Sequence, residues 1–71
     1  MWIQLKNVRM NLSNILDYVV YDDQILFTTT YLNVGEDEKN FNFFTIELTP
    51  AEIEKVIDYL DAYFYVTSIV D

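Results

Sequence analysis

The segment Thr49-Pro50-Ala51-Glu52 constrains the fold of this chain more than any other feature of its sequence. A threonine can accept a hydrogen bond from the amide three residues on, proline is favoured at the first helical position, and glutamate can reach back to the threonine amide. The apolar residues that follow recur at helical spacing and form one stripe: Ile53, Val56, Ile57, Leu60 and Phe64. The pattern predicts an α-helix over about residues 50–65.

The residues before this helix have the alternating and β-branched character of strands. Asn11-Leu12-Ser13-Asn14 predicts a turn because such side chains bond their own backbone, and Asp22-Asp23 predicts a tight hairpin turn. Residues 33–40 hold the only glycine and an acidic run, which is typical of a solvated loop. Four strands are therefore expected, beginning near residues 3, 15, 24 and 41 and ending near residues 6, 21, 32 and 48.

Short connections favour neighbouring strands that pair antiparallel. The sequence thus predicts an α+β fold, ββββα, in which a four-stranded antiparallel β-meander is followed by one C-terminal helix packed on one face. All 71 residues are expected to form a single domain. Residues 66–70 have β-branched character, and both a frayed helix end and a short terminal strand stay open for them.

Both faces of the predicted strands carry apolar or aromatic residues. Phe44, Ile46 and Leu48 share one face of the last strand, yet Phe41 and Phe43 lie on the other. An antiparallel sheet with one open face would show polar residues there, so a second copy of the chain is the simplest cover. The aromatic residues expected in a homodimer interface are Tyr31, Phe41, Phe43, Tyr59 and Tyr63.

The small size of the chain also favours self-association. A domain of about 70 residues is only marginally stable without disulfides, metals or oligomerisation. The sequence has no cysteine and no histidine, so it offers neither a disulfide framework nor the commonest zinc ligands. We expect no metal and no cofactor.

The net charge of the chain limits the partners that it can bind. Twelve acidic and four basic residues give a net charge of −8. Residues 1–35 carry two basic and three acidic residues, whereas residues 36–71 carry two basic and nine acidic ones. Such a chain repels phosphate backbones and anionic membranes and attracts basic surfaces. Six carboxylates in the predicted loop and on the polar side of the helix are the candidate partner-binding residues: Glu36, Asp37, Glu38, Glu54, Asp58 and Asp61.

The sequence offers few residues that could form a catalytic site. Ser13 and Ser68 have no histidine to activate them, and Lys6 and Lys55 are expected in solvent-facing positions. Paired carboxylates such as Asp22 and Asp23 are expected in turns, where water keeps acids at their ordinary strength. The acidic loop does not have the alternating spacing of a calcium-binding loop. The sequence predicts that the protein is not an enzyme.

These observations favour a small acidic protein-interaction module, a homodimer that binds or inhibits a basic partner such as a nucleic-acid-binding protein. A single-stranded nucleic-acid binder that uses sheet aromatics is one alternative, although the charge makes nucleic acid an unfavourable ligand. A structural assembly subunit is another. No apolar run reaches the length of a membrane helix and no secretory signal is seen, so the expected location is the cytoplasm, away from membranes.

Overall fold

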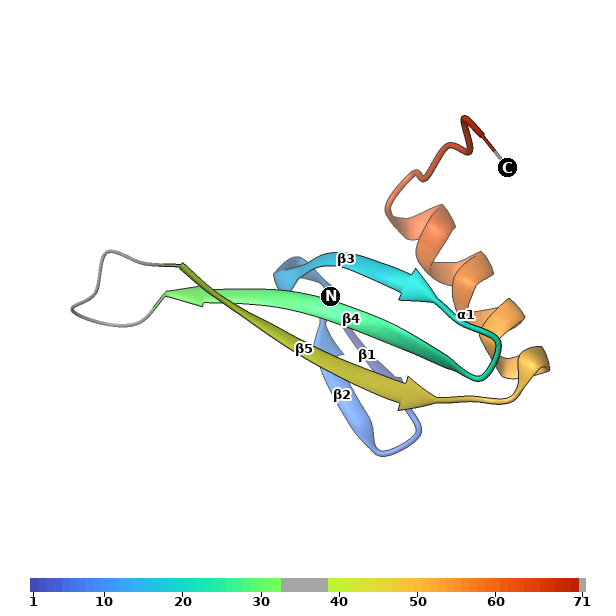
Figure 1. Ribbon diagram of the computed structural model, residues 1–71, viewed down its shortest axis with the longest axis horizontal. Helices are drawn as coiled ribbons and strands as arrows, with labels where there is room; N and C mark the ends of the chain where they lie inside the picture. The colour runs from blue at the N-terminus through green and yellow to red at the C-terminus, as the bar shows by residue number, and fades with distance from the viewer. Residues whose placement is uncertain (33–38, 71) are drawn as a thin grey trace.

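A computed structural model describes the backbone of residues 1–32 and 39–70. It describes the side chains of residues 1–29 and 42–70. The fold is α+β, as predicted, with two antiparallel sheets and one helix in the described residues (Figure 1). The elements, in chain order, are β1 (Trp2–Leu5), β2 (Val8–Asn11), a 3-10 turn (Leu12–Asn14), β3 (Ile15–Val20), β4 (Gln24–Leu32), β5 (Lys39–Glu47) and α1 (Pro50–Tyr63).

The predicted four-stranded meander is corrected in one respect. The first strand does not join the main sheet, because it pairs with a strand that the sequence reasoning missed, β2, and forms a separate hairpin. Leu5 lies opposite Val8, so only Lys6 and Asn7 make the turn. Lys6 adopts a positive φ of 56°, a conformation that glycine or asparagine usually occupies. Because a lysine stands at this position, the sequence gives no signal of the turn.

The main sheet has the order β3-β4-β5 and keeps the predicted meander for three strands. The amide of Tyr21 donates to the carbonyl of Gln24 across the Asp22-Asp23 turn, at 2.9 Å. The predicted turn at residues 11–14 is also confirmed, since the Asn11 side chain accepts a hydrogen bond from the Ser13 amide. The predicted acidic segment Glu36-Asp37-Glu38 lies outside the described residues.

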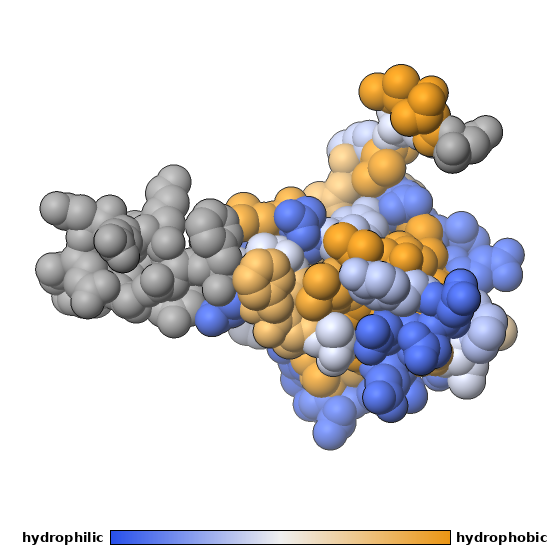
Figure 2. All heavy atoms as spheres, in the orientation of Figure 1, coloured by the Kyte–Doolittle hydropathy of each residue, from blue (hydrophilic) through white to orange (hydrophobic). Residues whose placement is uncertain are grey.

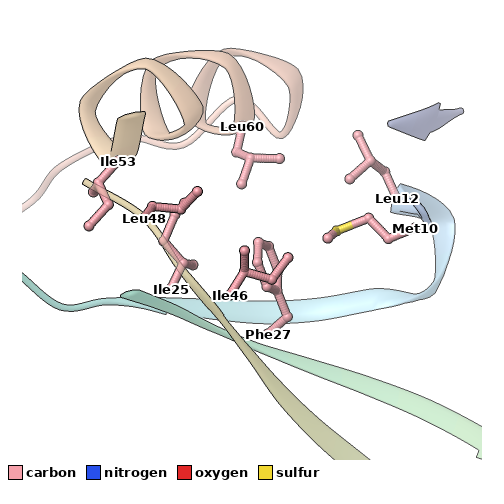
Figure 3. Packing of buried hydrophobic residues seen from close by; sticks show 8 residues of the cluster. All are labelled: Met10, Leu12, Ile25, Phe27, Ile46, Leu48, Ile53 and Leu60. Atoms are coloured by element: carbon pink, nitrogen blue, oxygen red, sulfur yellow. The ribbon is translucent and has the colours of Figure 1, made fainter. Parts of the chain in front are cut away.

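One face of the main sheet carries the hydrophobic core. Helix α1 and the β1–β2 hairpin both pack on this face, and Figure 3 shows the core side chains of the helix pointing toward those of the sheet. Phe27 is fully buried at the centre and stacks on Phe44, with ring centroids 5.3 Å apart. The buried residues come from both layers: Ile25, Phe27, Ile46 and Leu48 from the sheet side, Met10 and Leu12 from the hairpin and the turn after it, and Ile53 and Leu60 from the helix.

The helix begins as predicted and ends two residues earlier than predicted. Thr49 and Glu52 form the reciprocal capping box, in which the Thr49 amide donates to Glu52 Oε1 at 2.9 Å. At the other end, the amide of Val66 donates to the carbonyl of Asp61 and that of Tyr65 to Ala62. These bonds form a Schellman motif, which requires Tyr65 to adopt a positive φ, here 55°.

Residues 66–70 do not form a strand in the structure. They leave the end of α1 and project away from the sheet and the helix (Figure 1). The Schellman motif explains the direction, since it reverses the backbone at Tyr65 and prevents the helix from continuing.

Truncating the buried helical residue Leu60 tests how the helix packs on the core. Leu60 is 0% exposed beneath α1, so Leu60→Ala is expected to lower the free energy of unfolding by about 2–5 kcal/mol. Urea unfolding followed by circular dichroism measures the change. Asp58→Ala, on the exposed side of the same helix, is the control, and equal losses in the two variants would show that the helix register is wrong.

A glycine at the helix end is expected to stabilise the fold. Tyr65→Gly relieves the positive φ of an exposed residue, and the gain should be up to about 1 kcal/mol, because a side chain disfavours this conformation by roughly that amount. The melting temperature should therefore rise. A fall would mean that the Tyr65 ring makes contacts worth more than the backbone strain.

Candidate functional site

Several exposed carboxylates of the described residues lie near the start of α1 or along it. The amide of Leu48, just before the helix, donates to the carbonyl of Asp23 at 3.0 Å, so the β3–β4 turn lies beside the beginning of the helix. Figure 2 shows hydrophilic side chains gathered at this end of the sheet. We define the acidic surface as the exposed residues Asp22, Asp23, Glu47, Glu54 and Asp58.

The acidic surface continues along the β3 side of the helix. Glu54, Asp58 and Asp61 lie on one side of α1 because residues three and four apart in a helix are neighbours. Asp61 faces the sheet, where its Oδ1 accepts a hydrogen bond of 2.8 Å from the Tyr18 hydroxyl of β3. The structure therefore brings three of the six predicted partner-binding residues together beside an edge strand.

Asp61 differs from its two neighbours because it joins the helix to the sheet. It is half-buried, and burial raises the pKa of the Tyr18 hydroxyl well above its ordinary range, with the hydrogen bond to Asp61 and the negative charge of Asp61 acting in the same direction. Tyr18 thus stays protonated and donates. This contact spans 43 residues of sequence, so no local pattern could reveal it.

The residues predicted for self-association lie on two different surfaces. Phe43 lies on the face of the main sheet opposite the core and is 65% exposed. Tyr59 and Tyr63 lie on α1, partly exposed and stacked on one another with centroids 6.4 Å apart. Tyr31 and Phe41 belong to β4 and β5, but their side chains lie outside the described part of the chain.

The second face of the main sheet is partly apolar, as predicted. Register places Val19, Leu26 and Thr45 in one row across the three strands. The neighbouring row holds Asp17, Thr28 and Phe43. The helix and the hairpin cover the opposite face, so Val19 and Phe43 are exposed, and apolar side chains lie over the strands in Figure 2. We call these two rows the open sheet face.

An apolar groove of about 420 Å³ separates β1 from α1. Ile3 and Leu5 form its strand side, Val56 and Tyr59 its helix side, and Leu48 lies between them. Lys6 and Lys55 also line it, in a chain with only four basic residues. Sequence reasoning missed this groove because it depends on the hairpin, although Ile3, Leu5 and Val56 each belonged to a recognised apolar pattern.

The described residues hold no group of three or more acidic, cysteine or histidine side chains that could bind a metal ion. Glu52 lines the groove, but its carboxylate is engaged at the helix cap. The hydrogen bond from the Thr49 backbone lowers the pKa of Glu52, and that from the Thr49 hydroxyl and the charge of Lys6 act in the same direction. This arrangement stabilises a charged, structural carboxylate rather than a proton donor.

Among the described residues, no helix is both long and apolar enough to cross a membrane. No protein-family model, curated protein or solved structure matches this chain.

The contact between Tyr18 and Asp61 should determine how stability depends on alkaline pH. Because the folded-state pKa of Tyr18 is raised, its contribution is fully present below about pH 10, the ordinary tyrosine pKa, and is lost as the pH rises further. The free energy of unfolding should therefore fall above pH 10. Tyr18→Phe should weaken this fall and should cost about 1 kcal/mol at pH 7.

Urea titrations at pH 7 and above pH 10 measure both effects. Tyr65→Phe is the control, because Tyr65 is exposed and makes no side-chain hydrogen bond in the described structure. An unchanged alkaline fall in the Tyr18→Phe variant would contradict the coupling.

Proposed function

We propose that this protein is a non-enzymatic interaction module that binds a basic protein surface through its acidic surface and associates with itself. The observation that carries the proposal is that the exposed residues Asp22, Asp23 and Glu47 lie where the β3–β4 turn and the end of β5 meet the start of α1, and that the exposed residues Glu54 and Asp58 continue along the helix. Carboxylates from three segments are held there by one folded scaffold.

The electrostatics support a basic partner. A cluster of like charges on a protein of net charge −8 produces a long-range field that accelerates encounter with a cationic surface. The hydrogen bond between Tyr18 of β3 and Asp61 ties α1 to the main sheet, so the helical carboxylates need little ordering when a partner binds. A rigid anionic surface of this kind is suited to occupying the basic groove of a nucleic-acid-binding protein, which would inhibit that protein.

Self-association is the second part of the proposal. The open sheet face exposes Val19 and Phe43, and the helix exposes Tyr59 and Tyr63. Aromatic and aliphatic side chains on such surfaces gain free energy when a second copy removes them from water. The acidic surface lies at the end of the sheet and along the β3 side of the helix, so it stays accessible in a dimer formed through the open face.

The partner-binding surface can be located with a defined cationic probe. A fluorescein-labelled peptide of alternating arginine and lysine should bind the protein in a salt-dependent manner, measured by fluorescence anisotropy between about 20 and 300 mM salt. Asp58→Lys should weaken binding more than Asp17→Lys, which makes the same change of net charge on the open sheet face. Glu54→Lys combined with Asp58→Lys should weaken it further.

Asp61 is left unchanged in these variants because its loss would disturb the fold. Equal effects of Asp58→Lys and Asp17→Lys would mean that the probe responds to net charge alone, and the acidic surface would lose its assigned role. Circular dichroism of each variant confirms that the fold is retained.

One observation favours single-stranded nucleic acid as a second candidate. The exposed Trp2 borders a hollow of about 420 Å³ together with Arg9 and Phe44. An aromatic ring beside a cation can stack on a base and approach a phosphate. Binding of a labelled oligothymidine at about 20 mM salt, weakened by Trp2→Ala, would support this candidate, and absence of binding at that salt concentration would exclude it.

A further inference from the structure

The segment that follows α1 exposes apolar side chains that a folded chain usually buries. Ile69 and Val70 are 90% and 88% exposed, and Val66 is more than half exposed. In Figures 1 and 2 this segment projects from the molecule, and its apolar side chains lie away from the rest of the surface. Residues 66–70 are uncharged and mostly β-branched, and such residues favour an extended strand paired with a neighbouring strand.

The strand β1 has an unpaired edge within the described structure. The amide of Leu12 donates to the carbonyl of Met1, which places residues 1 and 12 in a hydrogen-bonded pair. Hydrogen-bonded and non-bonded pairs alternate along an antiparallel ladder. The register of the hairpin then directs the backbone N–H and C=O of Trp2 and Gln4 away from β2.

This free edge borders the groove between β1 and α1. Gln4 lines the groove together with the apolar side chains of Ile3 and Leu5, and Val56 lies across from them on the helix. The site therefore offers backbone hydrogen-bonding groups and an apolar surface at the same place. An extended apolar segment matches both, because it can add to a sheet edge through its backbone while its side chains enter the groove.

The same chain is poorly placed to fill its own groove. Val66 lies near Ile15 and Leu16, on the β3 side of the helix, which is also the side of Asp61. Val56 and Tyr59 point to the opposite side of α1, because each helical residue turns by about 100°. Residues 66–70 also point away from the start of the helix, where the groove lies (Figure 1).

We propose that residues 66–70 of one copy bind as an added β-strand on the free edge of β1 in a second copy. Ile69 and Val70 then leave water and fill the groove between β1 and α1. The inference rests on the self-association in the proposed function and adds a second, specific contact to the one through the open sheet face. Residues 66–70 are uncharged, and Lys6 and Lys55 line the groove, so the segment meets no direct charge repulsion there even though the partner has a net charge of −8.

The contact joins two different surfaces of the chain, and a two-fold dimer forms when two copies exchange the segment reciprocally. Each insertion involves only five residues, and small interfaces are weak and transient. The association should consequently depend on protein concentration and should exchange readily between copies.

Disulfide trapping tests the contact directly, because the chain has no cysteine of its own. The full-length variants Lys55→Cys and Ile69→Cys are prepared separately, one of them labelled with ¹⁵N, then mixed and oxidised mildly. Mass spectrometry should show a disulfide between the two variants. The matched control mixes Asp22→Cys, an exposed residue away from the groove, with Ile69→Cys.

Equal disulfide yields in the two mixtures would overturn the proposal. The double variant Lys55→Cys/Ile69→Cys addresses the remaining arrangement, in which the segment folds back on its own chain. If this variant forms an internal disulfide at high dilution while the mixture forms none, the groove is filled within one molecule and the proposal is wrong.

A second pair of variants separates this inference from the proposed function. Ile69→Lys/Val70→Lys places two positive charges in a groove lined by Lys6 and Lys55, so the dimer dissociation constant measured by light scattering should rise at least about tenfold. Ser13→Lys/Asn14→Lys makes the same change of net charge at exposed positions away from the groove and should have a much smaller effect.

If both variants remain as dimeric as the original protein, residues 66–70 do not hold the copies together, and self-association through the open sheet face stands alone. If the original protein is a monomer at every concentration, both this inference and the proposed self-association are wrong. Binding of the cationic peptide is measured separately and does not depend on either outcome.

Discussion

The burial of one sheet face beneath two different elements is the constraint on which the rest of this structure depends. A chain of 71 residues buries only a small hydrophobic core, which centres on the fully buried Phe27. The helix supplies Ile53 and Leu60 to one part of this core, while the hairpin and the turn after it supply Met10 and Leu12 to the other. Neither element alone covers the sheet.

This shared cover explains where the surfaces of the protein arise. Two elements that lie side by side leave a seam, and the groove between β1 and α1 is that seam. Both elements lie on one face, so the other face of the sheet remains uncovered with Val19 and Phe43 exposed. The Tyr18–Asp61 hydrogen bond fixes the helix against β3 and thereby positions the acidic residues of α1.

The sequence predicted those features that depend on local signals. The capping box at Thr49 and Glu52 located the start of the helix, and the Asp22-Asp23 turn located the first hairpin of the main sheet. The alternation in β5 also predicted correctly that Phe43 lies away from the core.

The missed features have physical reasons. The hairpin turn at Lys6 and the helix end at Tyr65 both use a positive φ at a residue with a side chain, where sequence reasoning expects glycine or asparagine. Surrounding packing and hydrogen bonds compensate for the local preference. The contact between Tyr18 and Asp61 and the groove beside β1 arise from tertiary packing of distant segments, which no single stretch of sequence specifies.

The solution mass across a dilution series, measured by light scattering at physiological ionic strength, tests the central claim most directly. The central claim is that exposed apolar surface in this acidic protein serves association between copies. The account predicts a mass of twice 8.5 kDa at high concentration that falls toward 8.5 kDa on dilution. A constant mass of 8.5 kDa at all concentrations would contradict it.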